Sequence, residues 1–589
     1  MTLAEIVLAL AKILVIITFP LLLAPLCIWA DRRQSAMIQH RIGPNRAVVN
    51  LPVMIVRGIL VAPAVLAGVG AVVGLGPTGN ARASLERTLI ATELAVLVGW
   101  LFLVVLSWRI RLRGPNNKIE QVIGSLEPRI YFYGGLAAHA AALVLARVIP
   151  AAAARQTNLA ATTALAVLLV GSAAYAALCL PGGTIGIRLA GTIHSAADAL
   201  KLFFKEDFIP KNADRLLHAL APMIAIFPSF VIMAVIPFGD TLCVGDPNKN
   251  GILEFSDLLA IAPSMARDGI CAGHAIPLQV ADLNVGILYL FAISSTGVIG
   301  AALAGWSSDN KFSLMGGLRA ASQMVSYEVT MGLSLMGVFI IASSLRLSPI
   351  VGWQQNHAWL IFVQPVAFFC FLAATCAETK RVPFDQPEGE SEIVAGYFLE
   401  YSGMKFGMFM AGEYIELIAS SALLVTIFFG GYGLPFLHQD GITVALGDTV
   451  LFAFRMNHVA VIVLSAVAFF GKTIIMIFVQ VFFRWTLPRF RYDQLMKFGW
   501  TKLLPVSIAN MFVTALACVL VDTAPAGVTN ALAVLADVTN FVVVAAMIAG
   551  PVYIIATMLR RTTHQTYVAS STGAFAAAAG GTKTTAMQA

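Results

Sequence analysis

Charged residues are scarce in this chain. Asp, Glu, Lys and Arg make up 12% of its 589 residues, whereas a soluble domain carries about a quarter. Hydrophobic residues make up 59%, and a soluble fold could not bury that much apolar surface. The composition therefore excludes an ordinary soluble domain and predicts a protein embedded in a membrane.

Cofactor motifs are also missing. The seven cysteines contain no Cys-x-x-Cys pair and no cysteine–histidine spacing suited to zinc or iron–sulfur ligation. No glycine-rich dinucleotide fingerprint follows a predicted strand. We therefore expect no iron–sulfur cluster and no flavin on this chain. Cys243 and Cys271 fall in one predicted loop, where an oxidising compartment would permit a disulfide, and the sequence leaves open whether they are bridged.

Long apolar runs recur along almost the whole chain. Each is long enough to cross the roughly 30 Å hydrocarbon core, which takes about 20 helical residues. Helices are expected because closed barrels show short alternating segments instead. The fold class is therefore an all-α polytopic bundle of about thirteen spans. They lie near 4–30, 52–76, 86–108, 129–150, 159–180, 212–238, 282–304, 314–343, 358–377, 406–433, 457–483, 502–522 and 528–558.

Lysine and arginine gather in short loops between the apolar runs. If the thirteen spans alternate in direction, six basic clusters fall on one side, which is the positive-inside pattern of a bacterial-type inner membrane. The N-terminus would then face out and the C-terminus in. The first apolar run carries Glu5 where a signal peptide has basic residues, so we expect it to remain. The tail after Arg561 has a disordered composition.

Residues 191–215 alternate between apolar and charged side chains. Leu200, Phe203 and Phe204 recur at helical spacing against Asp198 and Lys201. This pattern predicts an amphipathic helix lying along the membrane surface, with Lys205 and Glu206 at its end. The island 378–405, which is rich in acidic residues, is predicted to face the same side.

Five ionisable residues fall inside predicted spans, where each costs roughly 2.5 to 3.5 kcal/mol at mid-bilayer. They are Arg319, Glu328, Glu413, Glu416 and Lys472. Glu413 and Glu416 share a helix face because they are three residues apart. A row of carboxylates with a lysine can hold and pass protons, so the set predicts a proton path, although structural ion pairs between helices are the alternative.

One predicted outward loop has the spacing of a calcium-binding loop. Oxygen ligands fall at positions one, three, five and twelve, with a carbonyl at seven and glycine at six. Position twelve is Asp rather than Glu, so a plain turn is the alternative to a calcium site. The ligands would be Asp246, Asn248, Asn250, Ile252 and Asp257.

Several long stretches resemble one family. They are DRRQSAMIQHRIGPNR at 31–46, DALKLFFKEDFIP at 198–210, ADLNVGILYLFAISS at 281–295, GWSSDNKFSLMGGLRAASQMVSYEV at 305–329, AETKRVPFDQPEGESEIVAGYFLEYSGM at 377–404 and RWTLPRFRYDQLMKFGW at 484–500. Together they resemble the H subunit of the proton-translocating NADH:quinone oxidoreductase, complex I, which forms the heel of its membrane arm. The resemblance covers about 1–47 and 191–525.

The resemblance implies a membrane-arm subunit that forms a quinone tunnel with soluble partners. NADH would be oxidised on a partner subunit, and quinone would be the substrate. Glu328, Glu378 and Glu413 would begin a proton relay, with Glu416 and Lys472 alongside. The residues implied at the tunnel are Arg32, Arg33, Arg41, Asp198, Lys201, Lys205, Glu206, Arg381, Asp385, Glu388, Glu390 and Glu392.

About 150 residues separate GPNR from the amphipathic helix, where the family usually has a short connection. The chain therefore divides into residues 1–47, an inserted segment 48–190 of about four spans, a family-like core 191–525 of about seven spans, and an extra span with a tail at 526–589. Since four spans is an even number, the insertion would return the chain to the same side.

Three other interpretations compete with a complex I subunit, and the glutamates inside the predicted spans argue against one of them, a passive assembly anchor. The equivalent subunit of a membrane-bound hydrogenase would share the fold and take electrons from another donor. A cation/proton antiporter would also need acids inside the membrane, but that class typically shows inverted repeats, and none is evident in this sequence.

Overall fold

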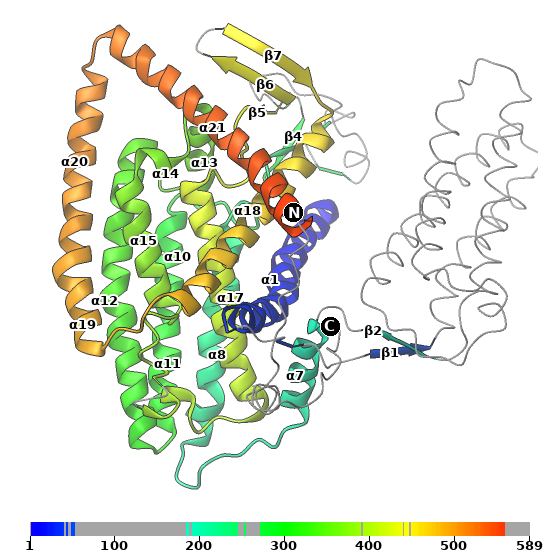
Figure 1. The fold of residues 1–589 in the computed structure, drawn as a ribbon, viewed down its shortest axis with the longest axis vertical. Helices are drawn as coiled ribbons and strands as arrows, with labels where there is room; N and C mark the ends of the chain where they lie inside the picture. Colours follow the sequence, from blue (N-terminus) through cyan, green and yellow to red (C-terminus); the bar gives the residue numbers. More distant parts are fainter. Residues whose placement is uncertain are drawn as a thin grey trace, which may run out of the picture.

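The structure is a computed structural model that describes residues 2–39, 43–44, 49–52, 184–187, 191–245, 253–254, 271, 273–389, 393–439, 441–446 and 449–559. It is a helical bundle with short strands at its margins (Figure 1). The helices are α1 (Leu3–Ile38), α7 (Ile193–Phe204), α8 (Arg215–Ile232), α10 (Gly286–Ser294), α11 (Thr296–Ser307), α12 (Lys311–Ala342), α13 (Leu347–Asn356), α14 (Leu360–Val363), α15 (Pro365–Glu378), α17 (Gly403–Phe428), α18 (His458–Thr486), α19 (Tyr492–Phe498), α20 (Leu504–Asp522) and α21 (Ala526–Leu559). Single helical turns lie at Met233–Val235, Gly396–Phe398 and Gly499–Leu503.

Within these ranges, eight helices are long and apolar enough to span a membrane, and Pro365–Glu378 is a shorter apolar helix. Together they confirm the all-α polytopic class and match the nine spans expected outside 48–190. The four spans expected in the insertion, and the tail after Arg561, lie outside the described residues.

The expected span at 358–377 is broken. α14 ends at Val363 and α15 begins at Pro365, because proline cannot donate the backbone hydrogen bond that would continue the helix. The intervening Gln364 bonds to α20 instead, donating to Thr514 Oγ1 at 2.8 Å and accepting from Asn510 at 3.0 Å.

α12, α15 and α17 form the centre of the bundle, and large buried side chains such as Tyr327, Phe371 and Phe428 fill the space between them. Small residues let other helices approach closely. A Cβ added to Gly300 of α11 would lie 2.7 Å from the backbone nitrogen of Ala225 in α8, so only glycine fits there.

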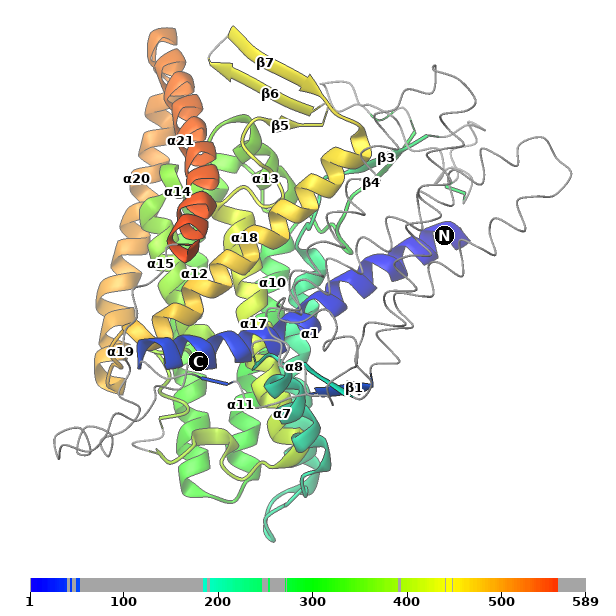
Figure 2. The same ribbon diagram turned by 45° about the vertical axis from the view of Figure 1, so that its right-hand side comes forward.

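Short strands mark one end of the bundle, here called the sheet end. β3 (Leu242–Val244) pairs with β4 (His274–Ile276), and β5 (Leu437–His438), β6 (Gly441–Leu446) and β7 (Thr449–Arg455) form an antiparallel sheet. Cys243 of β3 forms a disulfide with Cys271, which resolves the question that the sequence left open. The opposite end, called the loop end, carries α7, α19 and the segment 379–402, as Figures 1 and 2 show.

Two paired strands flank the insertion in the sequence. β1 (Val49–Pro52) and β2 (Thr184–Ile187) are antiparallel, with Pro52 opposite Thr184. A Cβ added to Gly191 would lie 1.9 Å from the carbonyl oxygen of Pro44, so the chain before the insertion touches the chain after it. The residues on either side of the insertion therefore lie together.

Residues 193–204 form the expected amphipathic helix. Leu200, Phe203 and Phe204 are exposed on α7, and the helix packs against α1 and α17. An exposed apolar stripe of this kind suits a helix that lies at a membrane surface.

Candidate functional site

Two glutamates share a face of α17 near the loop end. Glu413 and Glu416 are three residues apart and therefore lie on neighbouring positions of the helix surface. Glu413 is 6% exposed, and its Oε1 accepts a hydrogen bond of 3.1 Å from the Tyr397 hydroxyl. Tyr397 lies in the helical turn Gly396–Phe398, whose backbone packs against Gly316 of α12.

Two further glutamates meet at the junction of α10 and α11. Glu378 is the last residue of α15, and Glu328 lies within α12. The hydroxyls of two consecutive serines bind them: Ser294 donates to Glu378, and Ser295 donates to Glu328. The junction thus holds carboxylates from two different helices side by side.

These glutamates form a continuous series, here called the carboxylate row. It runs from Glu388 in the loop to Glu413, Glu416, Glu378 and finally Glu328. Each member interacts electrostatically with the next. Neighbouring carboxylates share protons readily because two adjacent negative charges are costly. The row therefore has the chemistry needed to hold and pass protons.

Two cations from the loop after α15 flank the row. Lys380 has a left-handed backbone, with φ 52°, and its ammonium lies 5.7 Å from the centre of the Tyr397 ring. It interacts with both Glu378 and Glu416. Arg381 is 7% exposed and stacks 4.2 Å from the Tyr414 ring centre, close to Glu413. These positive charges offset part of the negative charge of the row.

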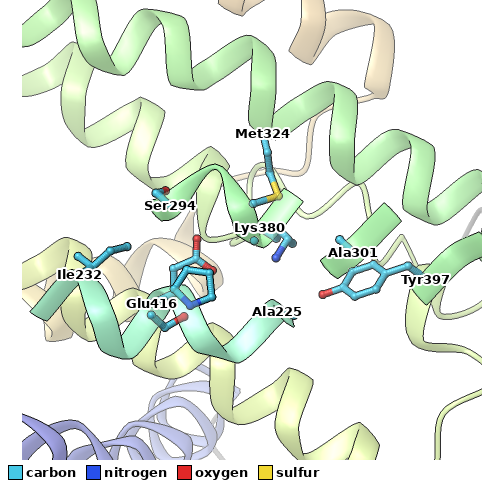
Figure 3. A pocket seen from close by; sticks show the side chains of 11 residues that line it. Ala225, Ile232, Ser294, Ala301, Met324, Lys380, Tyr397 and Glu416 are labelled. Carbon is cyan, nitrogen blue, oxygen red and sulfur yellow. The ribbon is translucent and has the colours of Figure 1, made fainter. Parts of the chain in front are cut away.

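A small cavity lies in the middle of the row (Figure 3). Its volume of about 20 Å³ is enough for one or two water molecules. Glu416, Lys380, Tyr397 and Ser294 line it, and Figure 3 shows the polar ends of Glu416, Lys380 and Tyr397 directed toward the same space. Water held here would connect Glu416 with its neighbours.

Glu388 is the member of the row that lies in the loop. Burial, and then the neighbouring Glu413 carboxylate, raise the pKa of Glu388 well above its ordinary value. A raised pKa favours the protonated acid, so Glu388 holds a proton at the loop end of the row more readily than an ordinary glutamate does.

Comparison with known proteins places these residues in a family. The family model described as NADH dehydrogenase matches residues 182–515. The chain is 39% identical over 330 residues to the NADH-quinone oxidoreductase H subunit 1 of Cytophaga hutchinsonii, covering 56% of this chain and 84% of that relative. It is 40% identical over 333 residues to the NADH-quinone oxidoreductase H subunit of Protochlamydia amoebophila, covering 56% and 86%. It is also 40% identical over 337 residues to the NADH-quinone oxidoreductase H subunit 1 of Geobacter sulfurreducens, covering 55% and 82%.

The chain belongs to the family of NADH-quinone oxidoreductase H subunits. All five members of its carboxylate row fall within the matched residues, and α21 lies beyond them. As a member of this family it is a multi-pass membrane component of a complex I assembly.

The residues expected at the tunnel of this complex I component fall into several groups. Arg32 of α1 forms an exposed ion pair of 2.6 Å with Asp198 of α7. Asp385 is buried and pairs with Arg489 at 2.5 Å. Lys201, Lys205 and Glu206 are exposed at the end of α7, and Arg33 lies on α1. Arg41, Glu390 and Glu392 lie outside the described residues.

Sequence reasoning missed a buried network beside the row. Asp31 of α1 is 5% exposed and accepts hydrogen bonds from Arg484 at 2.7 Å, Trp485 at 2.6 Å and Tyr414 at 3.1 Å. It also missed the roles of Lys380, Tyr397, Ser294 and Ser295 against the carboxylates. Two features of the sequence could have predicted this network. They are Asp31 at the end of the first span and the basic segment after residue 483.

Lys472 is not part of the carboxylate row. It lies on α18 and donates to the carbonyl oxygens of Phe429 and Gly433, just past the end of α17. Glu416 is thirteen residues before Phe429, which corresponds to about 20 Å along a helix axis. The sequence grouped Lys472 with the glutamates, and the structure places it at the other end of α17.

The expected calcium loop has no structural support. Asp246, Asn248, Asn250, Ile252 and Asp257 lie outside the described residues. Among the residues that are described, no group of three His, Cys, Asp or Glu side chains could hold a metal ion.

Proposed function

We propose that this protein forms the quinone-binding chamber of its complex and couples quinone reduction to proton translocation. The carboxylate row carries the proposal, because it is a continuous series of five acids leading from a buried loop into the membrane helices. The names of the relatives supply the reaction, which is electron transfer from NADH to a quinone.

The loop end is the proposed chamber wall. Arg32, Arg33, Asp198, Lys201 and Lys205 would edge its mouth, with Arg41 and Glu206 beside them. Arg381, Asp385 and Glu388, together with Glu390 and Glu392, would border the quinone path. Soluble peripheral-arm partners would close the chamber, oxidise NADH and supply electrons. With the N-terminus outside, this end faces the cytoplasm, where the basic loops favour it.

Coupling follows from electrostatics. A quinone takes up two electrons and two protons to become a quinol, and electrons that arrive first leave negative charge on the ring. One charge about 10 Å from a carboxyl, at an effective dielectric of about 20, contributes about 1.7 kcal/mol, or more than one pKa unit. That charge would raise the proton affinity of the carboxyl groups nearest the ring and so shift protons along Glu413 and Glu416.

The relay is tested by removing charge from two members. Glu328→Gln combined with Glu413→Gln preserves size and removes two proton carriers. Quinone reduction by the assembled complex and protons pumped per quinone reduced are measured in sealed vesicles. We expect the pumping ratio to fall while electron transfer is retained at least in part.

Glu400→Gln is the matched control. Glu400 accepts a 2.6 Å hydrogen bond from Asn310 at the loop end and is not a member of the row. Its substitution should leave the pumping ratio unchanged. An unchanged ratio in the double variant would refute the relay.

A further inference from the structure

Lys472 lies at the centre of α18, fourteen residues from either end of the helix, and is 9% exposed. Its Nζ donates to Phe429 O and Gly433 O, both at 2.8 Å. It also lies 5.1 Å from the centre of the Trp359 ring. Two carbonyls and an aromatic face therefore satisfy the three N–H groups of an ammonium ion.

The turn after α17 is built to receive this cation. Gly430 and Gly431 have left-handed backbones, with φ 71° and 50°, and so reverse the chain directly after Phe429. A Cβ on Gly430 would lie 2.8 Å from the Trp359 indole nitrogen. The carbonyls at a helix C-terminus carry partial negative charge, which stabilises a cation.

The neighbours of Lys472 that the structure describes include no base that takes its proton. Backbone carbonyls and an indole ring are not bases at neutral pH. Within the part of the chain that the structure describes, no carboxylate forms an ion pair with Lys472, and none contributes to its electrostatics. Each member of the carboxylate row, by contrast, has another carboxylate beside it. The two carbonyls and the indole face therefore favour the charged ammonium, and no carboxylate among the described residues pairs with it to exchange a proton.

Polar side chains continue beyond the carboxylate row along the interface of α17 and α18. Gln480 donates to Ser421 at 3.1 Å, and both are buried. Gln480 Oε1 is buried without a hydrogen-bond partner in the described part of the chain, which marks a place for water. Thr473, next to Lys472 in α18, is 0% exposed. This interface therefore leads from the part of α17 that follows Glu416, a middle member of the row, toward Lys472.

Beyond Lys472, buried polar residues resume at the sheet end. Ser465 of α18 accepts from the backbone of Asp240 at 3.3 Å. His458, at the start of α18, accepts from the backbone of Cys243 at 3.0 Å. Water along this whole interface would join the carboxylate row to the opposite face and dissipate any gradient.

We propose that Lys472 is a fixed cation that prevents protons from leaking along the α17–α18 interface. A positive charge held between these carbonyls and the indole ring repels hydronium, as charged barriers do in pores that exclude protons. The inference rests on the proposed function, since leakage matters only where the row carries protons. It assigns Lys472 a barrier role instead of the relay role expected from the sequence.

The test measures passive proton flux through the assembled complex in sealed proteoliposomes without NADH. An imposed membrane potential drives the flux, and an internal pH dye reports it. Lys472→Gln keeps amide donors for the two carbonyls and removes the charge, so we expect a several-fold rise in flux. Lys472→Arg keeps the charge, so its passive proton flux should equal that of the native protein.

A second substitution separates a barrier from a packing defect. Adding Gln480→Leu to Lys472→Gln makes the interface apolar on the row side of Lys472, and the flux should return to the native level. If Lys472→Gln does not assemble, as judged by NADH-driven quinone reduction, Lys472→Met replaces it with the same expected flux.

Native flux in an assembled neutral variant would overturn the proposal. So would a reduced pumping ratio without added flux, because that result would make Lys472 a proton carrier. Flux is measured without turnover, so this result is independent of whether the carboxylate row proves to be the relay.

Discussion

The two ends of α17 hold buried ionisable groups in opposite ways. Near the loop end, Glu413 and Glu416 lie among other acids, hydroxyls and a cavity with room for water. Just past the other end, Lys472 is held by two carbonyls and one aromatic face. Burial alone therefore does not reveal whether a group passes protons. The two ends differ in whether a second carboxylate lies beside the buried group.

The largest loss of stability is expected from substituting Asp31, which holds three side chains at the loop end. Asp31→Ala leaves Arg484 without its ion-pair partner and removes the acceptor of Trp485 and Tyr414. Removing one partner of a buried pair costs about 3–5 kcal/mol, and the two donors left without an acceptor add about 1–3 kcal/mol each. We expect a marked loss of assembled complex in membranes, measured by native gel and thermal unfolding. Accumulation at the native level would show that this network does not hold α1 against α18.

A smaller effect is expected just past the sheet-end terminus of α17. Gln354 Oε1 accepts from the backbone nitrogens of Gly430 at 2.9 Å and Leu360 at 3.2 Å. Gln354→Leu leaves both buried N–H groups unsatisfied, at about 1–3 kcal/mol each. Thermal stability should fall while protons pumped per quinone stay constant. A changed pumping ratio would mean that the two ends of α17 are not functionally separate.

The stability of the folded protein should depend on pH through Glu388, which lies at the loop end. Because the folded-state pKa of Glu388 is raised above its ordinary 4.5, the folded protein keeps a proton that the unfolded chain releases. Its contribution therefore favours folding least at high pH, and stability falls as pH rises from about 4.5 toward the folded pKa. Glu388→Gln should flatten this part of the profile of thermal unfolding against pH. An identical profile in the variant would contradict the raised pKa.

The smallest effect on assembly and activity is expected from removing residues 53–183. An Asn-Gly turn joining Pro52 to Thr184 would close the β1–β2 ladder as a hairpin. Since Pro44 already touches Gly191, the core should assemble and reduce quinone at close to the native rate. NADH-driven quinone reduction in membranes checks this, and loss of activity would show that the insertion supports the core.

The sequence predicted the spanning helices well because each is a long apolar run whose signal is local. It did not predict β3 to β7, since short strands depend on partners distant in the chain, such as Leu242 opposite Ile276. It paired Glu413 with Glu416 from helical spacing. It could not bring Glu378 and Glu328 to neighbouring serines, because that meeting depends on how α10, α12 and α15 pack.

The role of Lys472 could not be predicted for the same reason. A lysine within an apolar run looks the same whether its neighbour is a carboxylate or a helix terminus. Only the turn at Gly430 and the position of Trp359 distinguish the two cases.

The central claim is that quinone reduction moves protons along the carboxylate row. Infrared difference spectra of the assembled complex, recorded between its oxidised-quinone and reduced-quinone states, report changes in protonated carboxyl groups directly. The account predicts a carboxyl band that changes on reduction and is lost in Glu413→Gln but kept in Glu400→Gln. A spectrum with no carboxyl change, or one that Glu413→Gln leaves intact, would contradict it.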